Sequence, residues 1–149
     1  MTQMLQATKP QPLNLAWMTG WCAAVSLLGM ILVGSGFEAT SGPVRILFDV
    51  LNGPGELDLN PYVRFSLAIL GAVTMGWSLT LMAVIQVANQ LEKQVSKRIW
   101  IGMTASIIIW YVVDSILSIA TGFWLNAVSN TVFSATFLIP VIRSGVLRS

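Results

Sequence analysis

Residues that commonly do chemistry in proteins are scarce in this chain. The sequence has no His and one Cys, Cys22. Without His there is no His-ligated haem or zinc, no Ser-His-Asp or Cys-His nucleophile and no His proton relay. One thiol makes neither an internal disulfide nor a Cys-x-x-Cys pair, and no GxGxxG or Walker-type loop is present for nucleotide phosphates. We therefore expect a protein that is not an enzyme and that holds no haem or metal through His.

Asp114 is the most informative ionisable residue. It ends a charge-free run over residues 99–113, and a carboxylate inside a membrane span costs several kcal/mol unless it is neutralised or paired. From the helical rise, Asp114 and Asn130 each lie roughly 9 Å from the outer ends of their predicted helices, and Arg64 lies roughly 3–5 Å from the outer end of its own. We therefore predict one polar cluster of Arg64, Asp114 and Asn130, in which Arg64 and Asp114 form an ion pair.

Two interpretations of this polar cluster remain open. In the first, the ion pair is structural and fixes the order of the helices. In the second, the cluster binds an ion, a proton or a ligand, which an intramembrane charge usually indicates. We favour the structural interpretation, because a transporter needs a polar path to both faces and the inner halves of the predicted helices carry few polar side chains.

The composition indicates what kind of protein must hold these residues. Hydrophobic residues make up 55% of the 149 residues and charged residues only 9%, and the mean hydropathy is +0.76. A soluble domain carries about 25% charged residues, and a disordered chain combines low hydrophobicity with high net charge, so both classes are excluded. The remaining class is an integral membrane protein. The net charge of +2 comes from basic residues scattered near helix ends, so we expect no nucleic-acid partner.

Four apolar stretches are long enough for a membrane span, which needs about 20 residues. We predict helices at Leu15–Phe37, Tyr62–Val87, Trp100–Ala120 and Trp124–Ile142. Gly122 separates the last two, and glycine suits a tight helix–helix turn. The predicted fold is all-α, a single transmembrane domain over residues 1–149 built as an antiparallel four-helix bundle. The first stretch is longer than the roughly 7–15 apolar residues of a signal peptide, so we expect a retained helix.

A short helix is also predicted in the connection between the first two spans, over residues 43–52. Its apolar residues Val44, Leu47, Phe48 and Leu51 fall on one helical face. We expect an interfacial helix that lies on the outer membrane surface. The simplest role for it is to cover the outer end of the bundle.

The positions of the basic residues predict the orientation. Lys and Arg accumulate on the cytoplasmic side of membrane proteins, and one predicted side carries Lys93, Lys97, Arg98, Arg143 and Arg148. The connection Glu38–Pro61 lies on the other side and carries four acidic residues. We expect both termini in the cytoplasm, and the protein in a bacterial-type inner or energy-transducing membrane.

The second span carries small residues at every fourth position, namely Ala68, Ala72, Gly76 and Thr80. Small residues at this spacing let two helix backbones approach closely in lipid. We expect this ladder to pack the bundle internally. The alternative is that it docks a partner subunit.

Aromatic residues inside the spans are the only indication of a cofactor. Trp77, Trp110, Tyr111, Phe133 and Phe137 are candidates to line a groove for a pigment, a quinone or a lipid. Aromatic residues at such positions more often pack the bundle or face lipid. The cofactor therefore stays unknown, with a lipid or a pigment as the candidates.

The order of these parts resembles the BphX-like family of small four-helix bacterial membrane proteins. The matching features are a long first connection that ends in Asn60-Pro61-Tyr62-Val63-Arg64, glycines in the second span at Gly71 and Gly76, and a short Gly turn between the last two spans. In that family we expect a basic residue near the outer part of the third helix, where this chain has Asp114. The resemblance implies four spans, and it implies no activity, because none is established for that family.

The expected function follows mainly from what the sequence lacks. We expect a non-catalytic accessory or structural subunit of a larger membrane complex, with membrane lipids and other membrane subunits as partners. The alternative is a small oligomeric transporter or channel that uses Asp114 as an intramembrane coupling acid.

Overall fold

The structure, a computed structural model, describes residues 13–53 and 57–148. Its helices are α1 (Leu15–Val33), α2 (Gly42–Asn52), α3 (Pro61–Ala88), α4 (Lys93–Ala120) and α5 (Trp124–Ser144), with short 3-10 turns η1 (Gly34–Gly36) and η2 (Glu38–Thr40) after α1. The described residues contain no strand. Four of the helices, α1, α3, α4 and α5, are long and apolar enough to cross a membrane. The prediction of an all-α protein with four such helices is confirmed.

The first helix was predicted to end at Phe37, but α1 ends at Val33 and is followed by η1. The other predicted helix boundaries agree with the structure to within two residues except at the start of α4. That helix begins at Lys93 rather than Trp100. The apolar run begins only after Arg98, but Lys, Gln and Arg are good helix formers, so the helix extends through the charged segment. By contrast, α3 begins where predicted, because the Asn60 side chain accepts from the Val63 amide at 3.1 Å and Pro61 suits the first helical position.

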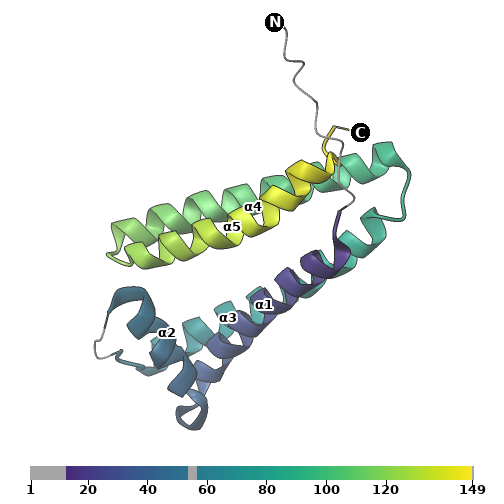
Figure 1. The fold of residues 1–149 in the computed structure, drawn as a ribbon. Helices are drawn as coiled ribbons and strands as arrows, with labels where there is room; N and C mark the ends of the chain where they lie inside the picture. Colours follow the sequence, from purple (N-terminus) through teal and green to yellow (C-terminus); the bar gives the residue numbers. More distant parts are fainter. Residues whose placement is uncertain (1–12, 54–56, 149) are drawn as a thin grey trace, which may run out of the picture.

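The long helices form two pairs (Figure 1). Along most of its length α1 packs against α3, and α4 packs against α5, whereas α3–α4 and α1–α5 contacts are few. The turn between α4 and α5 has Gly122 at φ 89°, a conformation that glycine adopts without strain. The pairs meet near the α3–α4 connection and separate toward α2. We call these two regions the connection end and the α2 end.

The α1–α3 pair is packed most tightly at Gly29 and Gly71. A Cβ atom on Gly71 would lie 2.5 Å from the Gly29 carbonyl oxygen and 2.6 Å from the Val33 amide nitrogen, so the two backbones are in direct contact. The predicted ladder does not make this contact. Its members Ala72 and Gly76 are exposed, and nothing lies within 4 Å of a Cβ added to Gly76.

The ladder was expected to pack the bundle internally, and the structure corrects this expectation for most of it. Ala68 is partly buried against Gly36, whose added Cβ would lie 3.5 Å from the Ala68 Cβ. Ala72, Gly76 and Thr80 lie on the outer face of α3. The face of α3 that contacts α1 contains Gly71 instead. Gly71 is one residue before Ala72 of the ladder, and successive residues of a helix are rotated by about 100° around its axis. The contact face and the ladder therefore point in different directions.

The main hydrophobic core fills the connection end. Its buried members come from all four long helices and include Met18, Trp21, Ile85, Trp100, Ile107 and Phe137. One polar contact between α1 and α5 depends on a proline. Pro140 lies inside α5 and has no N–H for the Thr136 carbonyl, and the Trp17 indole on α1 donates to that carbonyl at 2.9 Å.

A smaller core holds α2 at the other end. Leu32 of α1, Val44 of α2 and Leu59 before α3 are buried together. The Phe48 ring on α2 meets the Phe123 ring edge-on with centroids 6.0 Å apart, so α2 reaches from the α1–α3 pair to the α4–α5 turn.

Candidate functional site

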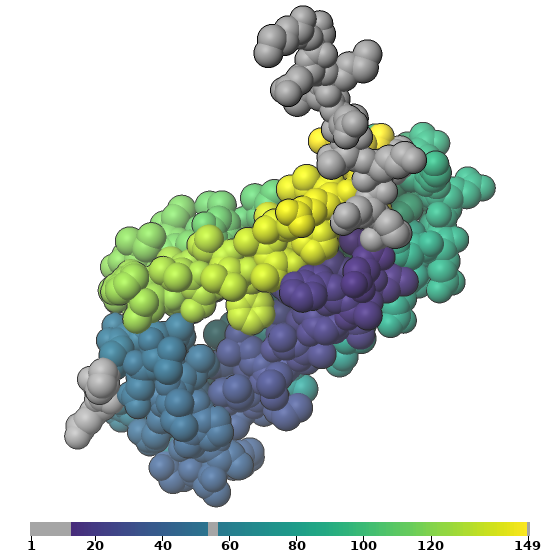
Figure 2. Space-filling model, viewed as in Figure 1, coloured from purple at the N-terminus to yellow at the C-terminus, as the bar shows by residue number. Residues whose placement is uncertain are grey.

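A cavity of about 970 Å³ lies between the two helix pairs, with α2 beside it. It is a consequence of how the pairs meet, because the core fills only the connection end. Figure 2 shows the surface hollowed between α1, α2 and α5. All five helices contribute lining residues, and this volume lies within the range of about 300–1,000 Å³ that is typical of small-molecule sites.

The walls contributed by α1, α2 and α3 are almost entirely apolar. Their lining residues are Trp21, Val25, Leu28, Leu32, Leu47, Phe48, Leu51, Leu67, Leu70, Val73, Thr74 and Trp77. The one hydroxyl in this set, on Thr74, donates to the Leu70 carbonyl at 2.8 Å. This side of the cavity therefore offers an occupant apolar contact and little hydrogen bonding.

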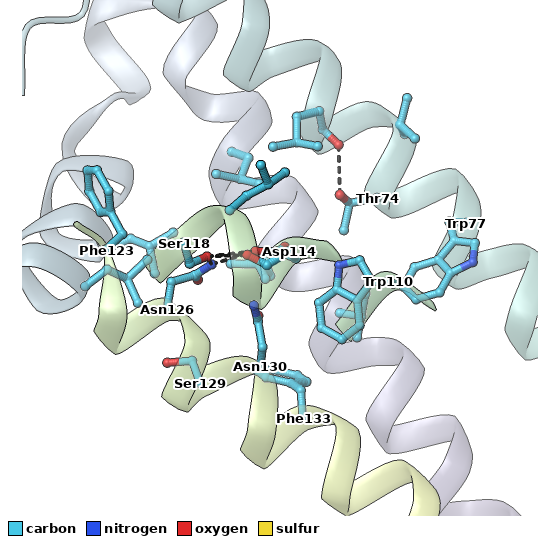
Figure 3. Close-up of a pocket in the computed structure, with 18 of the residues that line it drawn as sticks. Thr74, Trp77, Trp110, Asp114, Ser118, Phe123, Asn126, Ser129, Asn130 and Phe133 are labelled. Carbon is cyan, nitrogen blue, oxygen red and sulfur yellow. Dashed lines mark hydrogen bonds between the residues drawn. The ribbon is translucent and has the colours of Figure 1, made fainter. Parts of the chain in front are cut away.

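The wall contributed by α4 and α5 is polar, and Asp114 lies at its centre (Figure 3). The Asn126 amide donates to Asp114 Oδ1 at 2.9 Å, and the Ser118 hydroxyl lies 3.0 Å from the same oxygen. Asn126 also donates to Ser118 Oγ at 2.8 Å. Ser118 is one helical turn after Asp114 on α4, and the tight turn brings Asn126 of α5 opposite both. We call Asp114, Ser118 and Asn126 the polar triad.

Asn130 lies one turn further along α5 and lines the same cavity. Its side chain is 5% exposed, and its Nδ2 is buried with no hydrogen-bond partner among the described residues. In Figure 3 this nitrogen points toward Asp114. A buried donor without a partner costs roughly 1–3 kcal/mol, so the site holds unused hydrogen-bonding capacity.

The predicted ion pair between Arg64 and Asp114 is not formed. Arg64 instead pairs with Glu38, and it donates to the Ser35 carbonyl at 2.9 Å and the Leu59 carbonyl at 2.8 Å. The structure therefore brings Asp114 and Asn130 to one cavity and leaves Arg64 out of it. The helical rise alone does not determine which way a side chain points.

Asp114 has no basic neighbour in this cavity. None of the lining residues in the described part of the chain is Lys or Arg. Ser118 and Asn126 were not among the residues predicted for the site. Their signal was the turn spacing, because Ser118 follows Asp114 by four residues and the Gly122 turn folds Asn126 back onto them.

Aromatic rings close the cavity toward the connection end. The Trp21 and Trp77 centroids lie 6.5 Å apart, and the Trp77 and Trp110 centroids lie 6.1 Å apart. Three of the five aromatic residues singled out from the sequence, Trp77, Trp110 and Phe133, line the cavity. Of the other two, Tyr111 lies 3.2 Å from the Thr131 hydroxyl and Phe137 belongs to the core.

The chemistry available in this cavity is binding through one carboxylate. Among the described residues, no three His, Cys, Asp or Glu side chains lie together in a way that would hold a metal ion. A single carboxylate flanked by an amide and a hydroxyl accepts hydrogen bonds and attracts positive charge. The arrangement suits recognition of a ligand group.

Comparisons with known proteins do not identify a ligand or a function for this cavity. No family model, no curated protein and no solved structure matches the chain. The resemblance to the BphX-like family stays a prediction.

Proposed function

We propose that this chain is a non-catalytic accessory subunit of a bacterial-type inner or energy-transducing membrane, and that it holds an amphipathic molecule between its helix pairs. The observation that carries the proposal is the cavity, which is apolar on the α1–α3 side and polar at Asp114. An amphipathic molecule fits both walls, with its body against the leucines and its head group at the polar triad.

Membrane insertion is supported by the outer surfaces of the long helices. Large apolar side chains are exposed along them, including Phe65, Leu79, Val113, Ile116 and Ile119. In water such a surface would aggregate, whereas lipid tails satisfy it. In the proposed arrangement the four long helices run alternately up and down as an antiparallel bundle, α2 lies at the outer interface, and both termini are cytoplasmic.

The accessory role is supported by the outer face of α3. Ala72, Gly76 and Thr80 are exposed on that face, and no described residue lies within 4 Å of a Cβ added to Gly76. Small residues at this spacing favour close packing of a second helix in lipid. The proposed partners are therefore membrane lipids and the helices of other subunits.

A cavity-filling substitution tests the binding proposal. Ala105 lines the cavity, and Ala83 is exposed on α3 outside it. The chain, released gently from native membranes into lipid nanodiscs, is examined by native mass spectrometry. We expect a bound molecule of constant mass in the wild type and in Ala83→Phe, and its loss in Ala105→Phe. Equal adduct masses and occupancies in all three proteins would overturn the proposal.

A second candidate function is a small oligomeric transporter or channel with Asp114 as its coupling acid. The observation that favours it is that Asp114 borders a cavity and has no basic partner there. The connection end is filled by the apolar core, so transport would need a second conformation. Loss of solute uptake in proteoliposomes on Asp114→Asn, with assembly and cavity occupancy intact, would favour this candidate over the accessory subunit.

A further inference from the structure

We propose that the occupant of this cavity is a hydrophobic organic cation, an amine with an apolar body, whose ammonium group binds Asp114. This inference rests on the proposed function and specifies the ligand class of the same site. It comes from the charge, the hydrogen bonds and the aromatic walls of the cavity.

The charge of the cavity is unbalanced. Among the described residues that line it, Asp114 is the only ionisable one, since the others are apolar, aromatic, hydroxyl, amide or glycine side chains. Arg64, the expected counter-ion, is held by Glu38 and two backbone carbonyls. A carboxylate in apolar surroundings is stabilised strongly by a cation, so a positively charged ligand complements the site.

The hydrogen bonds leave one oxygen of the carboxylate available. Asn126 and Ser118 both lie within hydrogen-bond distance of Oδ1. Asn126 is held in turn by Ser118, so the Asp114 side chain is oriented before any ligand arrives. The buried Asn130 amide points at the same group from α5. An ammonium N–H that binds Oδ2 competes with none of the hydrogen bonds at Oδ1.

Aromatic rings stand beside the carboxylate. Figure 3 shows Trp110 and Trp77 on one side of Asp114, and Phe133 below Asn130. Cations are attracted to the faces of aromatic rings, and Trp is the strongest of these partners. A neutral or anionic head group lacks this attraction to the ring faces.

A phospholipid is a poorer match than a free amine. A phospholipid head group carries a phosphate, which proteins usually meet with Arg or Lys, and the lining residues include neither. A fatty acid would place its carboxylate against that of Asp114. The single charge of the site therefore selects a ligand with a single cationic group.

Matched chains with different head groups test this inference. The probes are 11-bromoundecylammonium, 11-bromoundecanol and 11-bromoundecanoate, whose bromine quenches the fluorescence of the lining residues Trp21, Trp77 and Trp110. The full chain is placed in phosphatidylcholine nanodiscs. We expect the ammonium probe to quench wild-type fluorescence at about tenfold lower concentration than the alcohol, because only the ammonium adds the attraction of opposite charges to a hydrogen bond with Asp114.

Substitutions show whether Asp114 is the cause. Asp114→Asn should remove the preference for ammonium and leave quenching by the alcohol unchanged, and Asp114→Glu should keep part of the preference. The matched control is Asp49→Asn, which removes an exposed carboxylate on α2 that does not line the cavity and should behave as wild type.

Three other outcomes are decisive. An ammonium preference that survives in Asp114→Asn would come from partitioning into the bilayer and would overturn the inference. Loss of the preference when phosphatidylethanolamine replaces phosphatidylcholine would identify a lipid head group as the occupant and would also overturn it. If no probe quenches the wild type more than Ala105→Phe, the cavity is not a binding site and the proposed function itself fails.

Discussion

Arg64 links three separate segments of the chain at the α2 end through hydrogen bonds and an ion pair. Its guanidinium donates to the Ser35 carbonyl in η1 and, through Nε, to the Leu59 carbonyl before α3, and it pairs with Glu38 of η2. Its side chain is only 18% exposed, whereas that of Glu38 is 74% exposed. The hydrogen bonds from Arg64 to the two carbonyls are therefore shielded from solvent, whereas solvent weakens the exposed ion pair with Glu38.

This difference predicts unequal costs for two substitutions. Arg64→Met should lower the free energy of unfolding by about 2–3 kcal/mol, because it removes hydrogen bonds from a charged donor. Glu38→Gln should cost less than about 1 kcal/mol, as exposed ion pairs do. Unfolding in mixed micelles measures both. Equal costs would show that the ion pair, and not the carbonyl contacts, holds this end.

Asp114 supplies the control for that experiment. Since Arg64 does not line the cavity, combining Arg64→Met with Asp114→Asn should give additive changes in unfolding free energy. Combining Arg64→Met with Glu38→Gln should cost less than the sum. A coupling above about 0.5 kcal/mol between Arg64 and Asp114 would restore the ion pair expected from the sequence.

Trp17 and Pro140 form a second contact that can be tested at single residues. The Trp17 indole donates to the Thr136 carbonyl, which has no helical donor because residue 140 is proline. Trp17→Phe should cost about 1 kcal/mol. In a Pro140→Ala background the same substitution should cost less, because the new backbone N–H satisfies the carbonyl. An unchanged cost in the two backgrounds would contradict this account.

The depth of polar residues could be predicted from the sequence, but their direction could not. A fixed rise per residue places Asp114 and Asn130 at similar levels on α4 and α5, and both line the cavity. Arg64 has a long, flexible side chain at the start of α3, so it follows the nearest acceptors. These acceptors lie in the connection between α1 and α3, and the conformation of that connection cannot be derived from hydrophobic periodicity.

At the scale of the elements, the packing of α1 against α3 rests on direct contact between the two helix backbones. Both helices were predicted, although α1 ends at Val33 rather than Phe37, and the ladder of small residues pointed to the wrong face of α3. A glycine shows its role only when the partner helix is known, because Gly71 and Gly76 look alike in the sequence. Gly71 meets Gly29, and Gly76 faces outward.

Alanine substitutions distinguish these two glycines. Gly71→Ala should destabilise the chain by about 1–3 kcal/mol, since its Cβ would lie 2.5 Å from a backbone oxygen and forced overpacking has costs of this size. Gly76→Ala, with no atom within 4 Å, should be neutral or stabilise by up to about 1 kcal/mol through helix propensity. The rate of Cys22 alkylation during unfolding reports both, because Cys22 is buried. The reverse order of stabilities would contradict the observed crossing.

At the scale of the whole molecule, the two helix pairs are joined firmly at one end only. The large core lies at the connection end, and the cavity separates the pairs at the α2 end, where α2 and the Phe48–Phe123 contact link them. A cavity of this kind is not visible in the sequence. It arises from the relative placement of four helices that all have similar apolar compositions.

Spin-label distances test this asymmetry in a Cys22→Ala background. Labels at the exposed positions Val87 and Val95, at the connection end, should give a narrow distance distribution. Labels at Ile69 and Ile119, also exposed, should give a broader distribution near the α2 end, and 11-bromoundecylammonium should narrow it. Two equally narrow distributions, unaffected by the probe, would show that the pairs are held rigidly at both ends.

The orientation in the membrane gives a further prediction. Lys93, Lys97 and Arg98 lie at the start of α4, and Arg143 and Arg148 lie at and after the end of α5, so these five basic residues belong to the connection end. Helix α2 lies at the other end. A reporter active only in the periplasm should be silent when fused after Arg148 and active when inserted between Gly53 and Leu57. The opposite pattern would place α2 and the acidic connection in the cytoplasm.

The pairing of α1 with α3 has a consequence for synthesis of the chain. Helix α3, which packs against α1 at Gly29, is complete only when residue 88 has been synthesised. At a synthesis rate of roughly 5–20 residues per second, several seconds pass between completion of α1 and completion of α3. The α4–α5 hairpin needs no such delay, because its two helices are adjacent in the sequence. The protein is therefore made as two successive units, and the cavity comes into existence only when the second docks against the first. A substitution that slows this docking would lower the yield of binding-competent protein while leaving each helix pair intact.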